Sequence, residues 1–297
     1  MPDQRKPKIF ICIPVHNRIN YTVKCLDSVW GQTYSNWQVI ICDDGSTDGT
    51  PAIVRNKFSS VIIESGNGNL FWAGGMNRCV EKALSIASDE DFIYTLNNDT
   101  ELLPNTLAAL LEKALAHPGS IIGTLNLFYQ EPSRIENSAF IFNGLSGFRR
   151  LRQFGELRRE EKGLFRVDGL AGKGALIPCK VFRSIGVYED KLLPHYHADL
   201  EFTFRAKKAG FKIFIDFDSH LLSHQGESGI GSVMSAPNLK EFLKSFSSIR
   251  STHHLPSLVA FSKLIYGRLY FLPLVRDLLF VNLGFLKRWV LHKLNKK

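Results

Sequence analysis

Two adjacent acids, Asp43 and Asp44, come directly after an apolar run over residues 37–42. One carboxylate of such a pair can cap a turn or the helix that follows it. The pair can also recognise a nucleotide base or ribose, because carboxylates accept hydrogen bonds from N–H and O–H groups. The residues alone leave both roles open.

A second apolar run, over residues 92–96, is followed by Asn97, Asn98 and Asp99. A single Asp at a strand end is usually structural. It could also help to hold a divalent cation whose other ligands are diphosphate oxygens and water, an oxygen-rich set that suits Mg²⁺ or Mn²⁺. Such a cation would neutralise charge on a departing diphosphate.

A third polar segment, residues 195–201, is dense in titratable side chains and leads into a predicted helix near Asp199. Asp199 could cap that helix, or it could be a general base that accepts a proton from an attacking hydroxyl group. Glu201 and Arg205 are about one helical turn apart, so we expect an ion pair between them.

Two histidines follow, His220 and His224, on either side of a predicted apolar turn. A lone His is more often structural than a ligand. His224 precedes a segment rich in Gly and Ser, and it could close over a bound metal–diphosphate.

Apolar runs alternate with helical patterns along the first part of the chain and must position these polar residues. The expected strands cover 8–15, 37–42, 61–64, 92–96, 121–127 and 212–216, and the expected helices cover 21–30, 46–58, 75–87, 104–116 and 199–209. Residues 128–165 are expected to be irregular, and residues 167–178 are apolar and rich in Gly. The alternation predicts an α/β fold with a Rossmann-like, mostly parallel sheet flanked by helices. The polar motifs fall at the carboxyl ends of strands, where such sheets bind ligands.

The net charge of +9 comes from one part of the chain. Residues 238–297 carry 11 Lys and Arg against two acids, whereas residues 1–237 carry 26 of each sign. This distribution argues against a nucleic-acid-binding protein. There is no GxGxxG motif after the first predicted strand and no GxxxxGK[ST] motif, which disfavours dinucleotide and P-loop sites.

The cysteines and the apolar stretches bear on the compartment. Five cysteines are an odd number without metal-binding spacing, and apolar neighbours predict buried thiols at Cys12 and Cys42. Residues 1–8 lack the apolar core of a signal peptide. The uncharged stretches near the C-terminus are shorter than the roughly 18–20 residues that cross a bilayer. We therefore expect a cytoplasmic protein without a transmembrane helix.

The order of the motifs resembles that of the family 2 glycosyltransferases, which have the GT-A fold. The nearest resemblance is to bacterial rhamnosyltransferase-like members that act in polysaccharide or O-antigen assembly. It covers residues 8–230 and rests on the joint order of motifs that are weak one by one. They are IPVHNR (13–18), Trp-Gly-Gln-Thr (30–33), DDGSTDGT (43–50), GNGNLFWAGGMN (66–77), LNNDT (96–100), GKGALIP (172–178) and HYHADLEFTFRAKKAGFK (195–212).

The resemblance implies a role for each matching residue. Asp199 would be the catalytic base, Asp99 would hold the metal ion, and His224 would be a late metal ligand. His16 would lie near the nucleotide base and Asp44 would hydrogen-bond to it, while Gly172 and Gly174 would border the donor sugar and the acceptor. The full set implied to bind the nucleotide-sugar is Pro14, His16, Arg18, Asp44, Asn69, Gly74, Gly75, Asn77, Asn98, Gly172 and Gly174.

Two motifs depart from the family pattern. The metal motif is Asn-Asn-Asp, with Asp99 as its only carboxylate, and Ala198 stands where the family usually has a Glu. The resemblance implies an inverting displacement in which Asp199 deprotonates an acceptor hydroxyl and Mg²⁺ or Mn²⁺ assists the leaving diphosphate. The first departure motivates an alternative, a non-catalytic nucleotide-sugar-binding subunit of a membrane-bound glycan assembly. A nucleotidyltransferase is disfavoured, because IPVHNR is not a Gly-rich basic loop.

Residues 274–294 form an amphipathic pattern when they are projected on a helix. Arg276, Lys287 and Arg288 share one arc, and most of the remaining arc is apolar and includes Trp289. Such a helix could pack on the catalytic domain or lie on an anionic membrane surface, and its cationic and aromatic content favours the membrane.

These observations predict a catalytic domain over residues 1–235 and a basic helical appendage over residues 236–297. We expect the protein to be peripheral on the inner face of the cell membrane. Its expected partners are a nucleotide-diphospho-sugar donor, a saccharide or lipid-linked acceptor and anionic lipid, without nucleic acid.

Overall fold

A computed structural model describes residues 5–137, 139–144, 147–151, 155, 157, 161–224 and 238–294. Its centre is a ten-stranded sheet with the path β10-β13-β6-β12-β4-β1-β2-β3, to which β5 is added beside β13 and β7 beside β6. The strands of this sheet are β1 (Ile9–Val15), β2 (Trp37–Asp43), β3 (Ile62–Ser65), β4 (Phe92–Thr95), β5 (Thr100–Leu102), β6 (Ile121–Phe128), β7 (Ile135–Asn137), β10 (Leu164–Arg166), β12 (Ala175–Pro178) and β13 (Ile213–Ser223).

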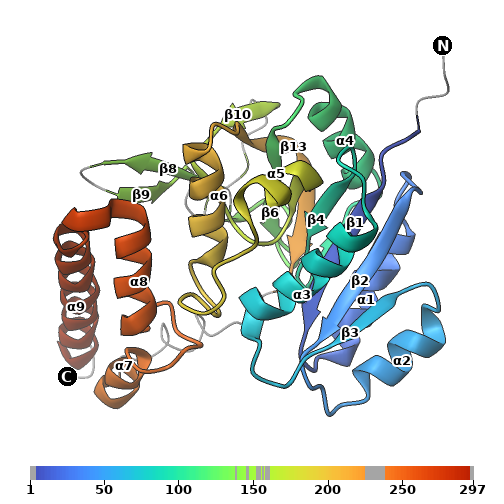
Figure 1. The fold of residues 1–297 in the computed structure, drawn as a ribbon. Coiled ribbons are helices and arrows are strands. Elements are labelled where there is room, and N and C mark those ends of the chain that lie inside the picture. The colour runs from blue at the N-terminus through green and yellow to red at the C-terminus, as the bar shows by residue number, and fades with distance from the viewer. Residues whose placement is uncertain are drawn as a thin grey trace.

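Helices cover both faces of the sheet, and three further helices follow it at the C-terminal end (Figure 1). The helices are α1 (Ile19–Trp30), α2 (Thr50–Lys57), α3 (Phe71–Ile86), α4 (Thr106–Ala116), α5 (Cys179–Ile185), α6 (Ala198–Lys208), α7 (Leu239–Ser245), α8 (Leu255–Tyr266) and α9 (Phe271–Leu294), with a short 3-10 turn, η1 (Gly267–Leu269). Every strand and helix predicted before residue 128 is present, with ends that differ by a few residues.

Side-chain alternation along β1 explains the two layers, because successive residues of a strand point to opposite faces. Ile11 and Ile13 belong to a buried cluster with Leu26 of α1 and Leu110 of α4. Phe10 and Cys12 belong to a second cluster on the other face, with side chains of α3, α5 and α6. The central strand is therefore apolar throughout, as expected of a sheet covered on both faces.

The strand directions confirm a mainly parallel sheet. β1 pairs in parallel with β2 and β4, β2 with β3, and β6 with β13. β12 runs antiparallel between β4 and β6. The pattern of apolar residues does not reveal this reversal, because a strand that is buried on both faces reads the same in either direction.

The prediction that residues 128–165 are irregular was wrong. Three short strands, β7, β8 (Ala139–Asn143) and β9 (Gly147–Arg150), lie within this range, and β10 begins at its end. β8 pairs with β9 and β11 (Gly169–Leu170) in a second, three-stranded sheet. The predicted turn between His220 and His224 was also wrong, because β13 continues to Ser223. Strands of three to five residues leave too few alternations to be recognised in a sequence.

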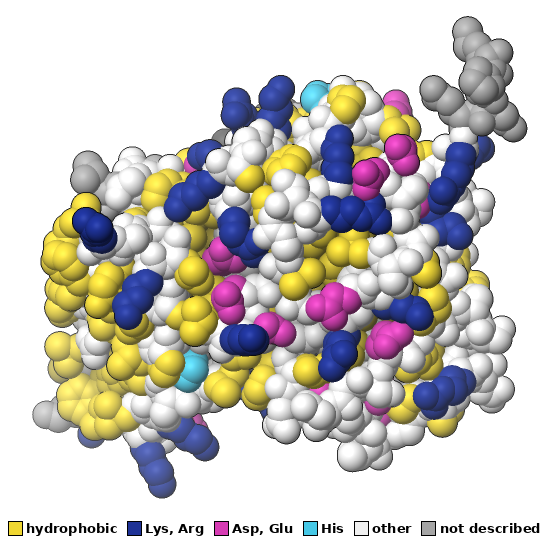
Figure 2. Space-filling view, in the orientation of Figure 1, with side chains coloured by type: hydrophobic (Ala, Val, Ile, Leu, Met, Phe, Trp, Pro, Cys, Tyr) yellow, Lys and Arg dark blue, Asp and Glu magenta, His cyan; other side chains and the backbone are white. Residues whose placement is uncertain are grey.

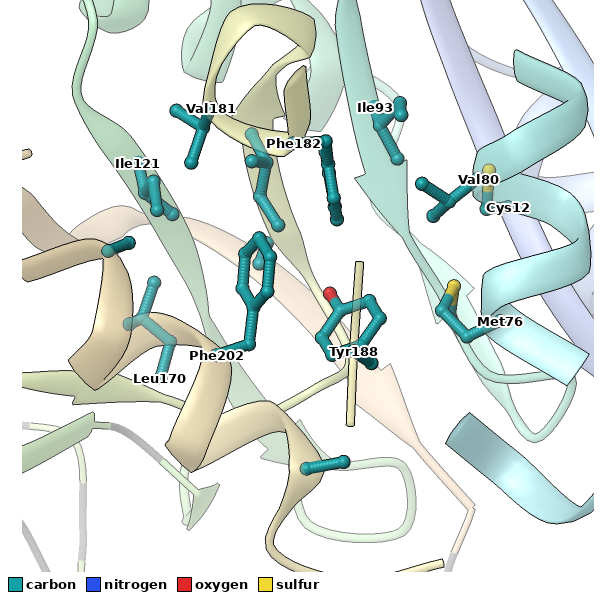
Figure 3. Close-up of a cluster of buried hydrophobic side chains, with 14 of the residues drawn as sticks. Cys12, Met76, Val80, Ile93, Ile121, Leu170, Val181, Phe182, Tyr188 and Phe202 are labelled. Carbon is teal, nitrogen blue, oxygen red and sulfur yellow. The ribbon is translucent and has the colours of Figure 1, made fainter. Parts of the chain in front are cut away.

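An aromatic cluster joins α5 and α6 to the sheet, and Figure 3 shows its side chains directed toward one another. The rings of Phe182 and Phe202 stack with their centroids 4.7 Å apart, and the ring of Tyr188 lies 4.6 Å from that of Phe202. Burial of a side chain of this size contributes about 1.5–3 kcal/mol. The cluster therefore fixes α6, which carries Asp199.

The C-terminal helices form a layer beside α6, with α8 between α6 and α9 (Figure 1). The predicted boundary at residues 235–236 lies outside the described residues. Among the residues that the structure describes, none of the helices combines the length and apolarity needed to cross a bilayer.

Candidate active site

The carboxyl ends of three parallel strands meet at one edge of the sheet. Val15 of β1 is in register with Asp43 of β2, and Cys12 of β1 is in register with Thr95 of β4. The polar residues that follow these strands therefore lie side by side, as the sequence predicts.

Asp44 is buried and organises the loop that leads into α3. Its carboxylate accepts the backbone N–H groups of Gly68 at 2.8 Å, Leu70 at 2.9 Å and Phe71 at 3.2 Å. Its carbonyl oxygen accepts a 2.7 Å hydrogen bond from Nδ1 of the exposed His16. In the structure, Asp44 therefore caps the loop that leads into α3. The contact of Asp44 with a nucleotide base stays a prediction.

The neighbouring Asp43 has a buried oxygen, Oδ1, without a hydrogen-bond partner. A buried carboxylate oxygen normally has a partner, so this atom is available to a ligand. The sequence presents the two acids as equivalent candidates. Only the pairing of Asp44 with the 66–71 loop separates them.

Asp99 has the features of a cation ligand. Its Oδ1 is buried and has no partner, while Oδ2 lies 3.4 Å from Nη1 of Arg18. His224 is next to it because the backbone N–H of His224 donates to the carbonyl of Asp99 at 2.9 Å, which continues the pairing of β13 with β5. Nε2 of His224 donates to Oε1 of Glu101 at 2.6 Å, and the ring stacks on Tyr129.

These residues fit a hard divalent cation that is held only in part by protein. The unpaired Asp99 oxygen is the kind of ligand that Mg²⁺ and Mn²⁺ prefer. No group of three or more His, Cys, Asp or Glu side chains among the described residues could hold a metal ion by itself. A cation here would need further oxygen ligands from a diphosphate and from water.

Asn98 and Arg18 lie next to Asp99. Nδ2 of the buried Asn98 donates to Oγ1 of Thr22 at 3.0 Å, which ties this edge to the first turn of α1. Asn17 connects the first two strands, because its backbone N–H donates to Oγ of Ser46 and its Oδ1 accepts the backbone N–H of Thr47. Asn98 therefore has a structural partner, whereas Arg18 reaches the predicted metal ligand.

Asp199 lies in the first turn of α6 and is largely enclosed by the chain while still partly accessible. Its Oδ1 accepts the backbone N–H of Leu200 at 2.8 Å, and its Oδ2 accepts that of Gly172 at 2.7 Å. Burial raises the pKa of the Asp199 carboxyl, and the two hydrogen bonds and the nearby His197 oppose this rise only in part. The result is a stronger base than an exposed Asp.

Trp72 links the Asp199 region to the strand edge, and it was not among the predicted site residues. Its indole Nε1 donates to Oδ1 of Asn97 at 2.9 Å. A Cβ atom at Gly172 would lie 2.4 Å from the Trp72 ring, so only Gly allows this approach. The contiguous GNGNLFWAGGMN motif contains Trp72, but an aromatic residue early in a helix is read first as core.

His195 is a second residue that the prediction missed. Its Nδ1 is buried without a hydrogen-bond partner. Burial lowers its pKa to about 4, with smaller contributions from Arg250 and Arg18. The ring is therefore neutral near pH 7 and adds hydrogen-bonding capacity without charge.

Backbone strain marks the same region. Among the described residues, the non-glycine positions with positive φ are Asn17, Arg18, Phe71 and His197. They stand immediately before or at the start of α1, α3 and α6, the three helices whose N-terminal ends surround the site. Such conformations cost about 1–3 kcal/mol each and are concentrated at functional sites.

Several predicted donor-binding residues have structural contacts instead of free polar groups. Asn77 exchanges two hydrogen bonds of 2.9 Å with the backbone of Tyr188. Gly75 lets α3 approach β1, since its Cβ would lie 3.0 Å from that of Pro14, and Gly174 has φ of +83° beside Thr124. Gly74 is buried in α3, and Asn69 is exposed at the loop tip.

A family model, Glycosyl transferase family 2, matches residues 10–186, which is more than half of the sequence. This chain belongs to that family. The match includes the strand edge, Asp44, Asp99 and Gly172, and it ends before α6.

Bacterial glycosyltransferases are similar to this chain over part of its length. The putative glycosyltransferase EpsE of Bacillus subtilis is 29% identical over 132 residues, which are 42% of this chain and 45% of that protein. The GalNAc(5)-diNAcBac-PP-undecaprenol beta-1,3-glucosyltransferase of Campylobacter jejuni is 33% identical over 110 residues, 36% of this chain and 35% of that one. The chain thus spans less than half the length of these relatives.

A solved structure has the same fold. GalNAc-T7, whose crystal structure contains UDP, GalNAc and Mn²⁺, superposes with a TM-score of 0.60 over 90% of this chain and 57% of its own, at 12% identity. This likeness confirms the GT-A fold that the motif order predicts.

Proposed function

We propose that this protein is an inverting glycosyltransferase that moves a sugar from a nucleotide-diphospho-sugar to a hydroxyl group of a saccharide or lipid-linked acceptor. The observation that carries this proposal is the arrangement of two carboxylates. Asp99 offers a buried, unpaired oxygen at the strand edge, and Asp199, its pKa raised by burial, is connected to that edge through Gly172, Trp72 and Asn97.

In this mechanism Asp99 would hold Mg²⁺ or Mn²⁺ together with diphosphate oxygens, and His224 would approach from the same side. The bound cation supplies charge neutralisation for the leaving diphosphate. Arg18 adds a second positive charge at that position. Asp43, with its unpaired Oδ1, would accept a hydrogen bond from the nucleotide base, while Asp44 shapes the loop around it.

Asp199 would accept the proton of the acceptor hydroxyl. The acceptor oxygen then bonds to the anomeric carbon as the bond from that carbon to the diphosphate oxygen breaks, and the anomeric configuration inverts. Backbone hydrogen bonds to both oxygens keep the Asp199 carboxylate in one orientation. Each oxygen retains a second lone pair that can receive the proton. Orientation and charge stabilisation account for most of the rate.

The activity can be tested by incubating the protein with a panel of nucleotide-diphospho-sugars and Mg²⁺ or Mn²⁺. We expect cation-dependent release of nucleoside diphosphate with at least one donor, suppressed by EDTA, and a transferred sugar of inverted configuration. Tight nucleotide-sugar binding without release or transfer would instead favour a non-catalytic subunit. Product of retained configuration would contradict the assigned mechanism.

We also propose that α9 rests on the anionic inner face of the cell membrane. Its apolar side chains are directed outward, as Figure 2 shows for the surface over α8 and α9. The exposed set on α9 is Phe271, Leu272, Val275, Leu279, Phe280, Leu283, Leu286, Trp289, Val290, Leu291 and Leu294. Phe285, in contrast, is buried and stacks on Phe242 of α7 at 4.0 Å.

An exposed apolar helix face of this extent marks a site of interaction with another protein or a membrane. Arg276, Lys287, Arg288 and Lys293 lie on the same helix with a single acid, Asp277. This excess favours anionic lipid over a second copy of the chain, because two cationic helices repel each other. The protein should sediment with phosphatidylglycerol vesicles and not with phosphatidylcholine vesicles. A soluble dimer that sediments with neither kind of vesicle would contradict the proposal.

A further inference from the structure

Helix α8 of the C-terminal appendage packs against α6, the helix that carries Asp199. At one end of the contact, Nζ of Lys208 on α6 donates to the carbonyl of Ile265 on α8 at 3.1 Å. At the other end, Oγ of Ser257 donates to the carbonyl of Leu192 at 3.3 Å. Figure 1 shows α8 standing between the catalytic helix and α9.

The contact reaches the catalytic end of α6 at His197. Nε2 of His197 donates to the carbonyl of Thr252, in the loop before α8, at 3.2 Å. The His197 ring also packs on Phe261 of α8, with centroids 5.0 Å apart and an angle of 30° between the ring planes. Both partners belong to the C-terminal appendage, so it holds this ring by one polar and one apolar contact.

His197 in turn determines where α6 begins. It is the N-cap residue and has left-handed dihedral angles, φ 73° and ψ −11°. Its carbonyl oxygen accepts the backbone N–H of Glu201 at 2.9 Å, a bond of the first helical turn. A His in this conformation is strained by about 1–3 kcal/mol and keeps it only where its surroundings enforce it.

Asp199 follows two residues later, in the turn that this conformation starts. Its carboxylate must meet the backbone N–H of Gly172 at 2.7 Å, so a small rotation of the helix end would change the direction of both oxygens. The His197 ring packs on Phe261, with ring centroids 5.0 Å apart. Beside its electrostatic effect on the pKa of Asp199, His197 influences the direction of that carboxylate through the helix end.

We infer that the C-terminal appendage is a part of the catalytic site, in which Thr252 and Phe261 hold His197 and thereby orient the Asp199 carboxylate. His197 and Phe261 are positioning residues. This inference rests on the proposed role of Asp199 as the base, and it goes beyond that role because it makes the appendage necessary even where no membrane is present. An appendage that served only as an anchor would leave the chemistry of a soluble reaction unchanged.

The test uses full-length protein, a soluble acceptor or water, and no lipid. His197→Gly removes both contacts but permits the left-handed backbone, and Phe261→Ala removes the ring contact from the side of the appendage. We expect each variant to lower kcat by about ten- to a hundredfold, because displacement of a catalytic group by about 1 Å has an effect of this size. The KM for the donor should stay within about twofold, since the strand edge is untouched.

Two controls separate positioning from stability. Lys208→Ala weakens the same helix contact at the end far from Asp199, and Phe261→Tyr keeps an aromatic ring on His197; both should retain the wild-type kcat. A parallel fall of kcat in Lys208→Ala and Phe261→Ala would overturn the inference, and so would wild-type kcat in both His197→Gly and Phe261→Ala. If the wild-type protein transfers no sugar at all, the proposed function fails and not this coupling.

Discussion

Substitution of Gly172 by Ala tests the geometry of the site more sharply than removal of a charged group. Gly172 is buried and its φ is not positive, so Ala brings no backbone strain. Its Cβ would lie 2.4 Å from Cζ2 of Trp72 and 3.1 Å from Cβ of Asp199. Carbon atoms pack best at about 3.5–4.0 Å, so the Trp72 contact alone must open by roughly 1 Å or more.

The added methyl group is enclosed on two sides, and either response disturbs the site. If the indole moves, its 2.9 Å hydrogen bond to Asn97 is lost; if Asp199 moves, the base leaves its position. We expect a stability loss of about 1–3 kcal/mol from overpacking. We also expect kcat to fall about a hundredfold, the effect of a 1 Å misplacement. Thermal unfolding and steady-state kinetics measure the two effects separately.

Gly144→Ala is a matched control, because a Cβ there has no neighbour within 4 Å and its φ is not positive. A second background sharpens the test. Trp72→Phe removes the two ring atoms nearest the added Cβ, so Gly172→Ala should have a much smaller effect in that background. A kcat within twofold of wild type in Gly172→Ala would refute the geometric reasoning, as would equal losses in both Trp72 backgrounds.

Further predictions concern the acids of the site. Asp44→Ala leaves three backbone N–H groups of the 66–71 loop without their acceptor and should lower the free energy of unfolding by about 3 kcal/mol. Asp43→Ala should leave the free energy of unfolding unchanged but weaken nucleotide binding. Scanning calorimetry measures the stability of both variants, and titration calorimetry measures their nucleotide binding. Asp99→Asn should abolish the dependence of donor binding on Mn²⁺, and donor titrations with and without Mn²⁺ show whether the dependence survives. Because burial raises the pKa of Asp199, kcat should fall as the pH falls through a midpoint above that of an exposed Asp, about 3.9; a pH–rate profile locates it.

The raised pKa of Asp199 also has a consequence for stability. The folded state holds the proton more tightly than the unfolded state, so the ionised Asp199 destabilises the fold at neutral pH. This cost disappears as the pH falls through the folded-state pKa. The proposed role of Asp199 as the base thus requires an ionised group that lowers the stability of the fold.

The parallel part of the fold follows from the sequence because its strands are apolar runs of uniform character. The site edge follows as well, since the carboxyl ends of β1, β2 and β4 must coincide once these strands pair in parallel. The antiparallel β12 and the small sheet of β8, β9 and β11 do not follow, because their pairings join distant segments with few residues each.

The positions of the polar residues were predictable from their motifs, but their hydrogen-bond partners were not. Asp199 and Asp99 lie where their motifs indicate, but whether an oxygen is free depends on backbone groups that the motif does not contain. Asp44 and Asn77 are occupied by the loop and by Tyr188, whereas Asp43 is not. The partners of His197 lie more than 50 residues away, in the C-terminal appendage. The composition of that segment indicates only an association with lipid.

The most direct test of the account is the transfer reaction of Asp199→Asn. The amide is nearly isosteric with the carboxylate but cannot accept the acceptor's proton. We predict that this variant binds the nucleotide-diphospho-sugar and the divalent cation as the wild type does and transfers no measurable sugar. Transfer at the wild-type rate would contradict the assignment of the base.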